Sequence, residues 1–244
     1  MMGKAEMKKT VIVMPVANEE NTMESVIKEI LALPYDNLYL YAIMDSYSKD
    51  GTADIIKRYE ELTKGKIQYV FYEKSYGVIS CYLEGFRRAL ADRAEWIIEM
   101  DGGGSHLPSQ IPQFIEGLQE GYDCVWGSRF VKGGGISNHP LYRRILSSGG
   151  TILANLVLGT KLKDMTSGFE AFQAYVLEKM DLDHFLSRGH MYQTEMRYYC
   201  RKLHTKEVPI HYTGSDSSFH LKSVTEAIRI LFELKRNEKN VMKG

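Results

Sequence analysis

Three loops of this chain place acidic and amide side chains directly after short apolar runs, where such groups could bind a nucleotide. They are Pro15-Val-Ala-Asn18-Glu19-Glu20, Asp45-Ser46-Tyr-Ser-Lys-Asp50-Gly-Thr52 and Asp101-Gly-Gly-Gly-Ser-His106. A carboxylate at a strand end can accept a hydrogen bond from a ribose hydroxyl, or hold a divalent cation on a diphosphate. Each loop alone could equally be a turn or a helix cap. Three such loops in series are a much more specific indication of a nucleotide site.

The elements that carry these loops alternate between strand-like and helix-like segments. We expect strands at residues 10–14, 38–44, 67–72, 96–100 and 124–127, and helices at 21–33, 52–63, 76–91 and 108–120. Pro15 is expected to end the first strand, and Asn21 with Glu24 three residues later resembles a capping box at the start of the first helix. The alternation predicts an α/β fold with a mostly parallel, doubly wound sheet flanked by helices. Ligands bind beyond the carboxyl ends of the strands in such sheets.

In the second half of the chain, strand-like and helix-like segments alternate less regularly. The apolar spacing there predicts helices at 141–158, 191–203 and 222–239 and a strand around 207–212. The last helix has one apolar face on an otherwise basic and polar surface, so it could dock on a membrane surface or pack on the core. That face consists of Val224, Ala227, Ile228, Leu231 and Leu234. No Pro/Gly/Ser-rich linker divides the chain, so we expect a single domain over residues 1–244.

Composition excludes several classes of protein. Lys plus Arg equals Asp plus Glu, at 31 each, so no global field favours nucleic acid. Three widely spaced cysteines without a C-x-x-C pair predict reduced thiols rather than a disulfide framework or a zinc site, as in a cytoplasmic protein. The start has no apolar signal region, and no apolar run approaches the ~18 residues of a membrane span.

The three loops resemble the motifs of family 2 glycosyltransferases with the GT-A fold, which read P-x-x-N-E-E, D-D-x-S-x-D-G-T and D-x-D. Four blocks in the second half look like those of polyprenyl-phosphate sugar synthases, of which the dolichyl-phosphate mannose synthases are the best known. The blocks are Gly127-Ser-Arg129-Phe-Val-Lys-Gly-Gly-Gly135, Pro140-Leu-Tyr-Arg143-Arg144, Asp164-Met-Thr166-Ser167-Gly168-Phe169 and Tyr192-Gln193-Thr-Glu195-Met196. The resemblance covers residues 8 to 235.

This resemblance implies an inverting transferase that moves a sugar from a GDP- or UDP-sugar, first of all to a polyprenyl (dolichyl) phosphate. It divides the chain into a nucleotide-sugar half at 8–130, an acceptor half at 131–221 and the C-terminal helix at 222–244. It assigns the nucleotide to Pro15, Asn18, Glu19, Asp45, Ser46 and Asp50. It assigns phosphate or acceptor binding to Arg143, Arg144, Thr166, Ser167, Gln193, His220 and Lys222. It assigns catalysis to Asp101, Arg129 and Glu195, with Mg²⁺ or Mn²⁺ at Asp101 and peripheral contact with the cytoplasmic membrane face.

The chain departs from the family pattern at several positions. Ser46 replaces the second Asp of D-D, and Gly103 replaces the second Asp of D-x-D, so we expect a weakly held cation. Alternatively, His106, Arg129 and Lys222 would replace part of the charge of that cation. The basic R-x-x-G-x-S-K segment is altered across residues 214–222.

Two alternatives therefore stay open. One is a soluble transferase for a saccharide or small molecule, which would need Asp101 or Glu195 as a base. The other is a degenerate nucleotide-binding homologue. The G-x-G-x-x-G loop of nucleotide-dependent oxidoreductases is absent.

Overall fold

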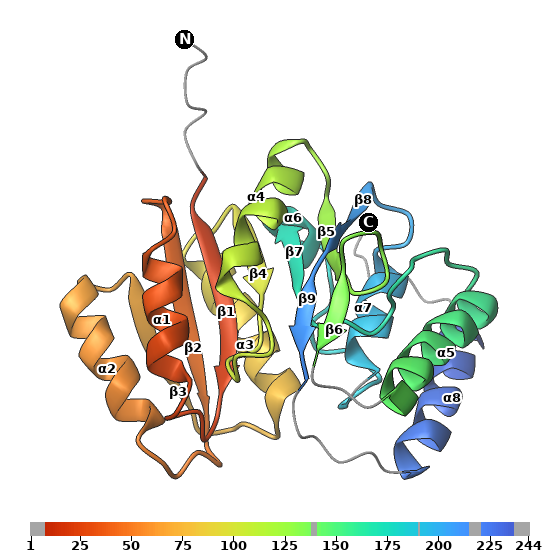
Figure 1. The fold of residues 1–244 in the computed structure, drawn as a ribbon, viewed down its shortest axis with the longest axis horizontal. Helices are drawn as coiled ribbons and strands as arrows, with labels where there is room; N and C mark the ends of the chain where they lie inside the picture. The colour runs from red at the N-terminus through yellow and green to blue at the C-terminus, as the bar shows by residue number, and fades with distance from the viewer. Residues whose placement is uncertain (1–7, 138–140, 190, 215–220, 237–244) are drawn as a thin grey trace.

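A computed structural model describes residues 8–137, 141–189, 191–214 and 221–236, with the backbone alone at 141–145 and 221–224. Its main sheet has seven strands, all parallel to their neighbours except the antiparallel β7 (Figure 1). The spatial order is β3 (Ile67–Tyr72), β2 (Leu38–Asp45), β1 (Thr10–Val16), β4 (Trp96–Glu99), β7 (Glu170–Gln173), β5 (Cys124–Ser128) and β8 (Thr205–Pro209). The expected mostly parallel sheet is confirmed. Since β7 and β8 come from the second half, both halves build one sheet.

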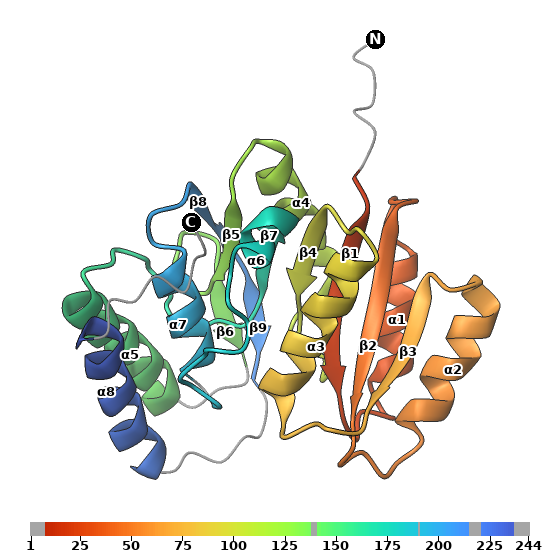
Figure 2. The same cartoon turned by 180° about the vertical axis from the view of Figure 1, so that it is seen from behind.

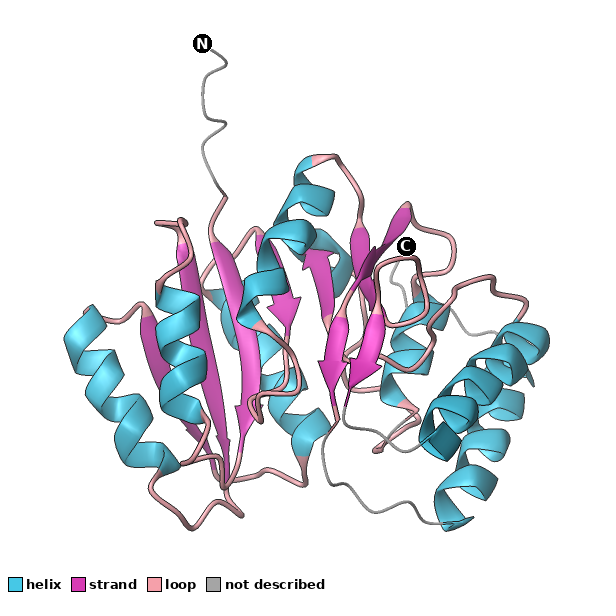
Figure 3. Cartoon of the chain, in the orientation of Figure 1, coloured by secondary structure: helices cyan, strands magenta, loops and turns pink. Residues whose placement is uncertain are grey.

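Helices cover both faces of this sheet, and each face carries its own apolar layer (Figures 1 and 2). One face is covered by α1 (Met23–Leu31), α2 (Thr52–Thr63) and α4 (Ile111–Gln119), the last preceded by a 3₁₀ turn at Pro108–Gln110. The other is covered by α3 (Val78–Ala91), α6 (Ala174–Glu178) and α7 (Tyr192–Tyr199). Strands β1, β2 and β4 all point to one edge of the sheet, where their loops gather (Figure 3).

Two local expectations about the first strand and helix are wrong. Pro15 lies inside β1 rather than at its end, because the β1–β4 ladder stops at Val13 and the missing Pro15 N–H removes no bond there. The capping box is absent, because the N-cap is Thr22, which makes no side-chain cap bond. Glu24 instead bonds Lys28 at 2.9 Å and helix α2 through Arg58.

The strand expected around 207–212 is two strands that belong to different sheets. Strand β8 ends at Pro209, paired with Ser128 of β5, and β9 (His211–Thr213) pairs with β6 (Gly135–Ser137) in a separate two-stranded sheet. The Ile210 backbone N–H still donates to the Ser128 carbonyl at 3.0 Å. The chain therefore changes sheet within one residue, at a proline that cannot donate to a ladder.

Helices α5 (Leu141–Leu158) and α8 (Leu221–Arg236) lie side by side at the end of the molecule beyond α7 (Figures 1 and 2). The expected single apolar face of the last helix is divided between core and solvent. Leu231 and Leu234 are buried in the core together with Ile230, whereas Ile228 is 39% exposed. Ala227 is half-buried, and the side chain of Val224 lies outside the described residues. This helix therefore packs on the core and also presents apolar surface.

Candidate functional site

The loops after β1 and β2 are locked together by hydrogen bonds between their backbones and side chains. Asn18 accepts from the Lys49 backbone N–H at 2.9 Å, and its own N–H donates to Ser48 at 3.1 Å. Its φ of 57° is a left-handed conformation that asparagine adopts more readily than most residues. The Glu19 N–H donates to the Thr52 hydroxyl at 2.8 Å. Asn18 thus fixes the shape of the site.

Asp50 joins the same two loops, while Asp45 contacts helix α3, where the Cys81 thiol lies 4.0 Å from Asp45 Oδ2. One Asp50 oxygen accepts from the Thr52 hydroxyl and N–H at 2.6 and 3.1 Å, and the other accepts from the Glu20 N–H at 3.0 Å. Burial opposes ionisation of Asp50, but these hydrogen bonds hold its pKa below the usual value. Asp45 ends β2, accepts from the Tyr47 N–H at 3.0 Å and is nearly buried. Ser46 is exposed beside it. The expected roles of Asp45 and Ser46 in nucleotide binding stay predictions.

Asp101 stands directly beyond β4 with its carboxylate held from helix α3. The Tyr82 hydroxyl donates to Asp101 Oδ1 at 2.6 Å, and the Asp101 N–H donates to His106 Nδ1 at 3.1 Å. The His106 ring is buried against Phe169, with centroids 4.8 Å apart. Burial lowers the pKa of His106 against the charge of Asp101, and its Nδ1 accepts a hydrogen bond, so both observations favour the neutral ring. They argue against the expectation that His106 supplies positive charge, which stays untested.

The three glycines after Asp101 let this loop pack against the first loop. A Cβ on Gly102 would lie 2.8 Å from a Val16 methyl and 3.0 Å from the carbonyl oxygen of Pro15, which is buried. A Cβ on Gly103 would lie 2.9 Å from Glu19 Oε1. The carboxylate of Glu19 therefore occupies the space beside position 103.

Glu19 itself is half-buried among other carboxylates. Burial raises the pKa of Glu19, and the charges of Asp101 and Asp50 raise it further against a hydrogen bond from Thr22. Crowding of like charges at the edge of a sheet is relieved by a bound cation. The edge formed by Glu19, Asp45 and Asp101 is thus suited to a ligand that brings positive charge or hydroxyl donors.

Arg129 follows β5 and forms a bidentate pair with Asp164. Its Nε and Nη2 donate to the two Asp164 oxygens at 2.7 and 2.8 Å, and Nη2 also donates to the Thr166 hydroxyl at 2.6 Å. Burial would raise the pKa of Asp164, but Arg129 holds it at about 2. Because the pair is neutral overall, Arg129 offers directed N–H donors rather than an excess charge. Its expected contact with phosphate stays a prediction.

The segment 164–169 is held between this pair and helix α7. The Asp164 N–H donates to Glu207 at 3.0 Å. The Phe169 N–H donates to the Ser167 hydroxyl at 3.4 Å. Gln193 of α7 lies against Gly168, since a Cβ on that glycine would be 3.1 Å from Gln193 Nε2. The D-x-T-S-G-F block and Gln193 therefore lie together, and their expected role at the acceptor stays a prediction.

Glu195 occupies a different environment from the one expected of a base. It is completely buried and accepts from the Leu186 and Ser187 N–H groups at 2.8 Å each, and from the Tyr199 hydroxyl at 2.5 Å. Burial raises its pKa against these hydrogen bonds. This environment indicates a carboxylate that orders residues 186–187, and it does not fit a base that faces a substrate.

Four expected residues have no described side chain. His220 lies outside the described residues, and Lys222 belongs to the part of α8 described by its backbone alone. Arg143 and Arg144 lie in the first turn of α5, where the same limit applies. Their assignment to phosphate or acceptor stays a prediction.

Sequence reasoning did not single out Tyr82, nor the buried group formed by Glu99, Glu170 and Arg197. Tyr82 reads as one more apolar position of α3, and only the fold brings its hydroxyl to Asp101. The sequence does give a signal for these three residues, because each is an ionisable residue that stands among apolar or aromatic neighbours. Such residues are rarely buried unless they are paired.

Comparisons with known proteins place these observations in a family. A family model described as glycosyl transferase family 2 matches residues 11–181. Polyprenol monophosphomannose synthase of Mycolicibacterium smegmatis is 27% identical over 208 residues, which cover 84% of this chain and 77% of the relative. Undecaprenyl-phosphate mannosyltransferase of Micrococcus luteus is 33% identical over 170 residues, which cover 69% of each chain.

A solved structure shows the same fold. Glucosyl-3-phosphoglycerate synthase of Mycobacterium tuberculosis, in complex with Mn²⁺, uridine diphosphate and glucosyl-3-phosphoglycerate, matches with a TM-score of 0.64. The match has 16% identity and covers 97% of this chain and 81% of that one. At this identity the likeness establishes the fold alone.

Proposed function

The chain belongs to glycosyl transferase family 2 and has the GT-A fold, and from this premise we propose that it transfers a sugar from a GDP- or UDP-sugar to a polyprenyl phosphate. The two relatives named for polyprenyl-phosphate acceptors support this choice. The nucleoside is assigned to the edge formed by Asp45, Asp50 and the first loop. The diphosphate is assigned to the neighbourhood of Asp101 and Arg129.

The chemistry of the site favours an acceptor that is already an anion. A phosphate oxygen attacks the anomeric carbon while the bond from that carbon to the diphosphate breaks, so the configuration inverts and no base is needed. The observation that carries this choice is the environment of Glu195, one of the two candidate bases, whose carboxylate is buried and accepts three hydrogen bonds. The other candidate, Asp101, is assigned below to the cation. A sugar hydroxyl would require a positioned base. Arg129, oriented by Asp164, stabilises the leaving diphosphate.

We assign the cation of this reaction, Mg²⁺ or Mn²⁺, to Asp101 together with Glu19. The Glu19 carboxylate fills the space that a side chain at Gly103 would take, so the first loop supplies the second carboxylate that the altered D-x-D motif lacks. Hard cations take oxygen ligands, and Mg²⁺ is commonly held by one or two carboxylates and substrate phosphates. The cation would neutralise charge that develops on the diphosphate. The Mn²⁺ complex of the structural neighbour supports metal use by this fold.

Moving the second carboxylate from position 19 to position 103 tests the metal assignment. Glu19→Ala should weaken Mn²⁺ binding in the presence of UDP or GDP by about tenfold or more, measured by electron paramagnetic resonance. The double variant Glu19→Ala/Gly103→Asp should restore it, because the smaller residue at 19 leaves room for an aspartate at 103. Glu29→Ala, an exposed position on α1, is the matched control. Unchanged Mn²⁺ binding in Glu19→Ala would contradict the assignment.

A lipid acceptor requires contact with a membrane, and we assign that contact to the surface shared by α5 and α8. Among the described residues no helix is long and apolar enough to span a bilayer. Several large apolar side chains of these two helices are nevertheless exposed: Leu146, Ile152 (68%), Leu153 and Leu156 (78%) on α5, and Ile228 and Phe232 (59%) on α8. Lys235 and Arg236 add positive charge in the last turn of α8. We propose peripheral docking on the cytoplasmic membrane face through this surface.

A thermal-shift panel of GDP, UDP and their sugars, each with and without Mn²⁺, tests the donor site. A ligand at about 100 times its dissociation constant adds about 2.7 kcal/mol, which should raise the midpoint of this chain by roughly 5–10 °C. A shift with one base only would name the donor. No shift with any of them would favour a degenerate homologue that keeps the fold without the chemistry.

A further inference from the structure

A group of buried ionisable side chains lies behind the site and takes no part in the proposed reaction. Glu99 and Glu170 are directly opposite each other in the antiparallel pair of β4 and β7, and both are completely buried. Two carboxylates in this position would repel each other, and burial raises the pKa of both groups, that of Glu99 well above its usual range and that of Glu170 to about 7. Arg197 of α7 compensates for Glu170, since its Nη1 donates to Glu170 Oε1. Its guanidinium also lies 5.1 Å from the centre of the Trp126 ring.

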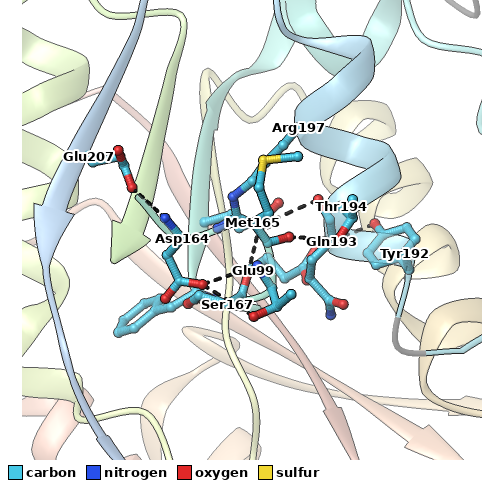
Figure 4. A network of polar contacts seen from close by, with 12 residues as sticks. Glu99, Asp164, Met165, Ser167, Tyr192, Gln193, Thr194, Arg197 and Glu207 are labelled. Atoms are coloured by element: carbon cyan, nitrogen blue, oxygen red, sulfur yellow. Dashed lines mark hydrogen bonds and ion pairs between the residues drawn. The ribbon is translucent and has the colours of Figure 1, made fainter. Parts of the chain in front are cut away.

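The same guanidinium nitrogen connects this group to the site. It donates to the Ser167 carbonyl at 2.7 Å, and one turn away on α7 the Thr194 hydroxyl donates to the Met165 carbonyl at 2.8 Å (Figure 4). Helix α7 therefore holds the 164–169 segment at two carbonyls, one on each side of Thr166. The Thr166 hydroxyl is the group that accepts from Arg129.

The stability of the core gives no clear reason for this buried pair. Arg197 Nε and Nη2 and Glu170 Oε2 are buried and have no hydrogen-bond partner among the described residues. A buried ion pair with incomplete hydrogen bonding commonly loses as much free energy in desolvation as it gains by attraction. An apolar replacement of similar volume would serve the core as well. The feature that such a replacement cannot reproduce is the bond to the Ser167 carbonyl.

We propose that Arg197 is a positioning residue, which with Glu170 as its counter-ion fixes the 164–169 segment through Ser167. That segment carries Asp164 and Thr166, the two partners that orient Arg129 at the diphosphate. The contacts alone support the structural part of this inference. Its kinetic part rests on the proposed function.

The test removes both members of the pair, so that neither charge is left unpaired. Glu170→Gln/Arg197→Met should fold, because neutral replacement of a whole buried pair is often tolerated. Amide hydrogen exchange in peptides that cover 164–169 should become about tenfold faster or more. Arg201→Met is the matched control, since the Arg201 guanidinium donates to the Tyr198 carbonyl and lies over the Tyr198 ring beside the same helix. In this variant the exchange of 164–169 should stay at the wild-type rate.

Kinetics provide the second readout. The double variant should lose about tenfold or more in kcat, with the KM for the donor within about twofold of wild type, because a displaced Arg129 weakens transition-state contacts. Arg197→Lys keeps the charge and serves if the double variant does not fold. It should fold and show a smaller loss of kcat in the same direction.

Wild-type exchange and wild-type kcat in a folded double variant would overturn the inference. Failure of the wild-type enzyme to use any polyprenyl phosphate would instead count against the proposed function. In that case the exchange of 164–169 would still decide the role of Arg197.

Discussion

The pair between Arg129 and Asp164 makes a quantitative prediction for Asp164→Asn. The pKa of Asp164 is held at about 2, below its usual value of 3.8. A shift of this size corresponds to about 2 kcal/mol of stability at neutral pH. The amide also leaves a guanidinium, with a side chain only 9% exposed, without its counter-ion. Loss of one partner of a buried pair typically costs about 3–5 kcal/mol. Both figures describe the same ion pair and are not additive, so we expect the free energy of unfolding to fall by about 2–5 kcal/mol.

The pH dependence of this prediction has a defined sign. The folded-state pKa of Asp164 is depressed, so the stabilisation is complete above about pH 4 and is lost as the pH falls towards about 2. Urea unfolding at pH 7 and pH 3 should therefore show the difference between wild type and Asp164→Asn shrinking by about 1 kcal/mol at pH 3. Asp36→Asn, in an exposed turn, should change neither value. Equal urea midpoints of wild type and Asp164→Asn at pH 7 would refute the reasoning.

Three further predictions follow from single features of the structure. Gly102→Ala should lower the free energy of unfolding by about 1–3 kcal/mol in urea titrations, because its Cβ meets β1 closely. Gly149→Ala, in α5 with nothing within 4 Å, should raise it by up to about 1 kcal/mol, and equal effects of the two would contradict the steric argument. Ile152→Glu/Leu156→Glu should weaken sedimentation with anionic vesicles at an unchanged thermal midpoint. Equal sedimentation would exclude α5 as the docking surface. Burial lowers the pKa of His106, so the unfolded chain binds its proton more tightly, and stability should decline as the pH falls below about 6.5. His106→Gln should lessen that decline in urea unfolding at pH 7 and pH 5.

The first half of the fold could be predicted from the sequence because its elements carry their own patterns. Helix α2 and strand β3 were expected with the bounds that the structure gives them, since apolar spacing and turn residues mark both ends. Strand β7 was not expected. Its four residues begin with Glu170, a buried carboxyl that is paired with Arg197 from a helix later in the chain. A single sequence gives no signal for such a pairing.

The candidate site shows the same division between local and distant information. The motifs correctly located Asp45 and Asp101 on loops that lie close together beyond β2 and β4, and Arg129 on the loop after β5. The contacts of these residues could not be predicted from the sequence. The hydrogen bond from Tyr82 to Asp101 and the position of Glu19 beside Gly103 depend on how separate loops and helices pack together. The burial of the His106 ring, which lowers its pKa, could not be read from its neighbours in the sequence.

The most direct test of the central claim is sugar transfer to a lipid phosphate in vesicles. The enzyme would be incubated with a labelled GDP- or UDP-sugar, Mn²⁺ and either a polyprenyl phosphate or the matching unphosphorylated polyprenol. We predict a labelled lipid product with the phosphate only. Labelling of the polyprenol, or of soluble saccharides in place of the lipid phosphate, would contradict the claim.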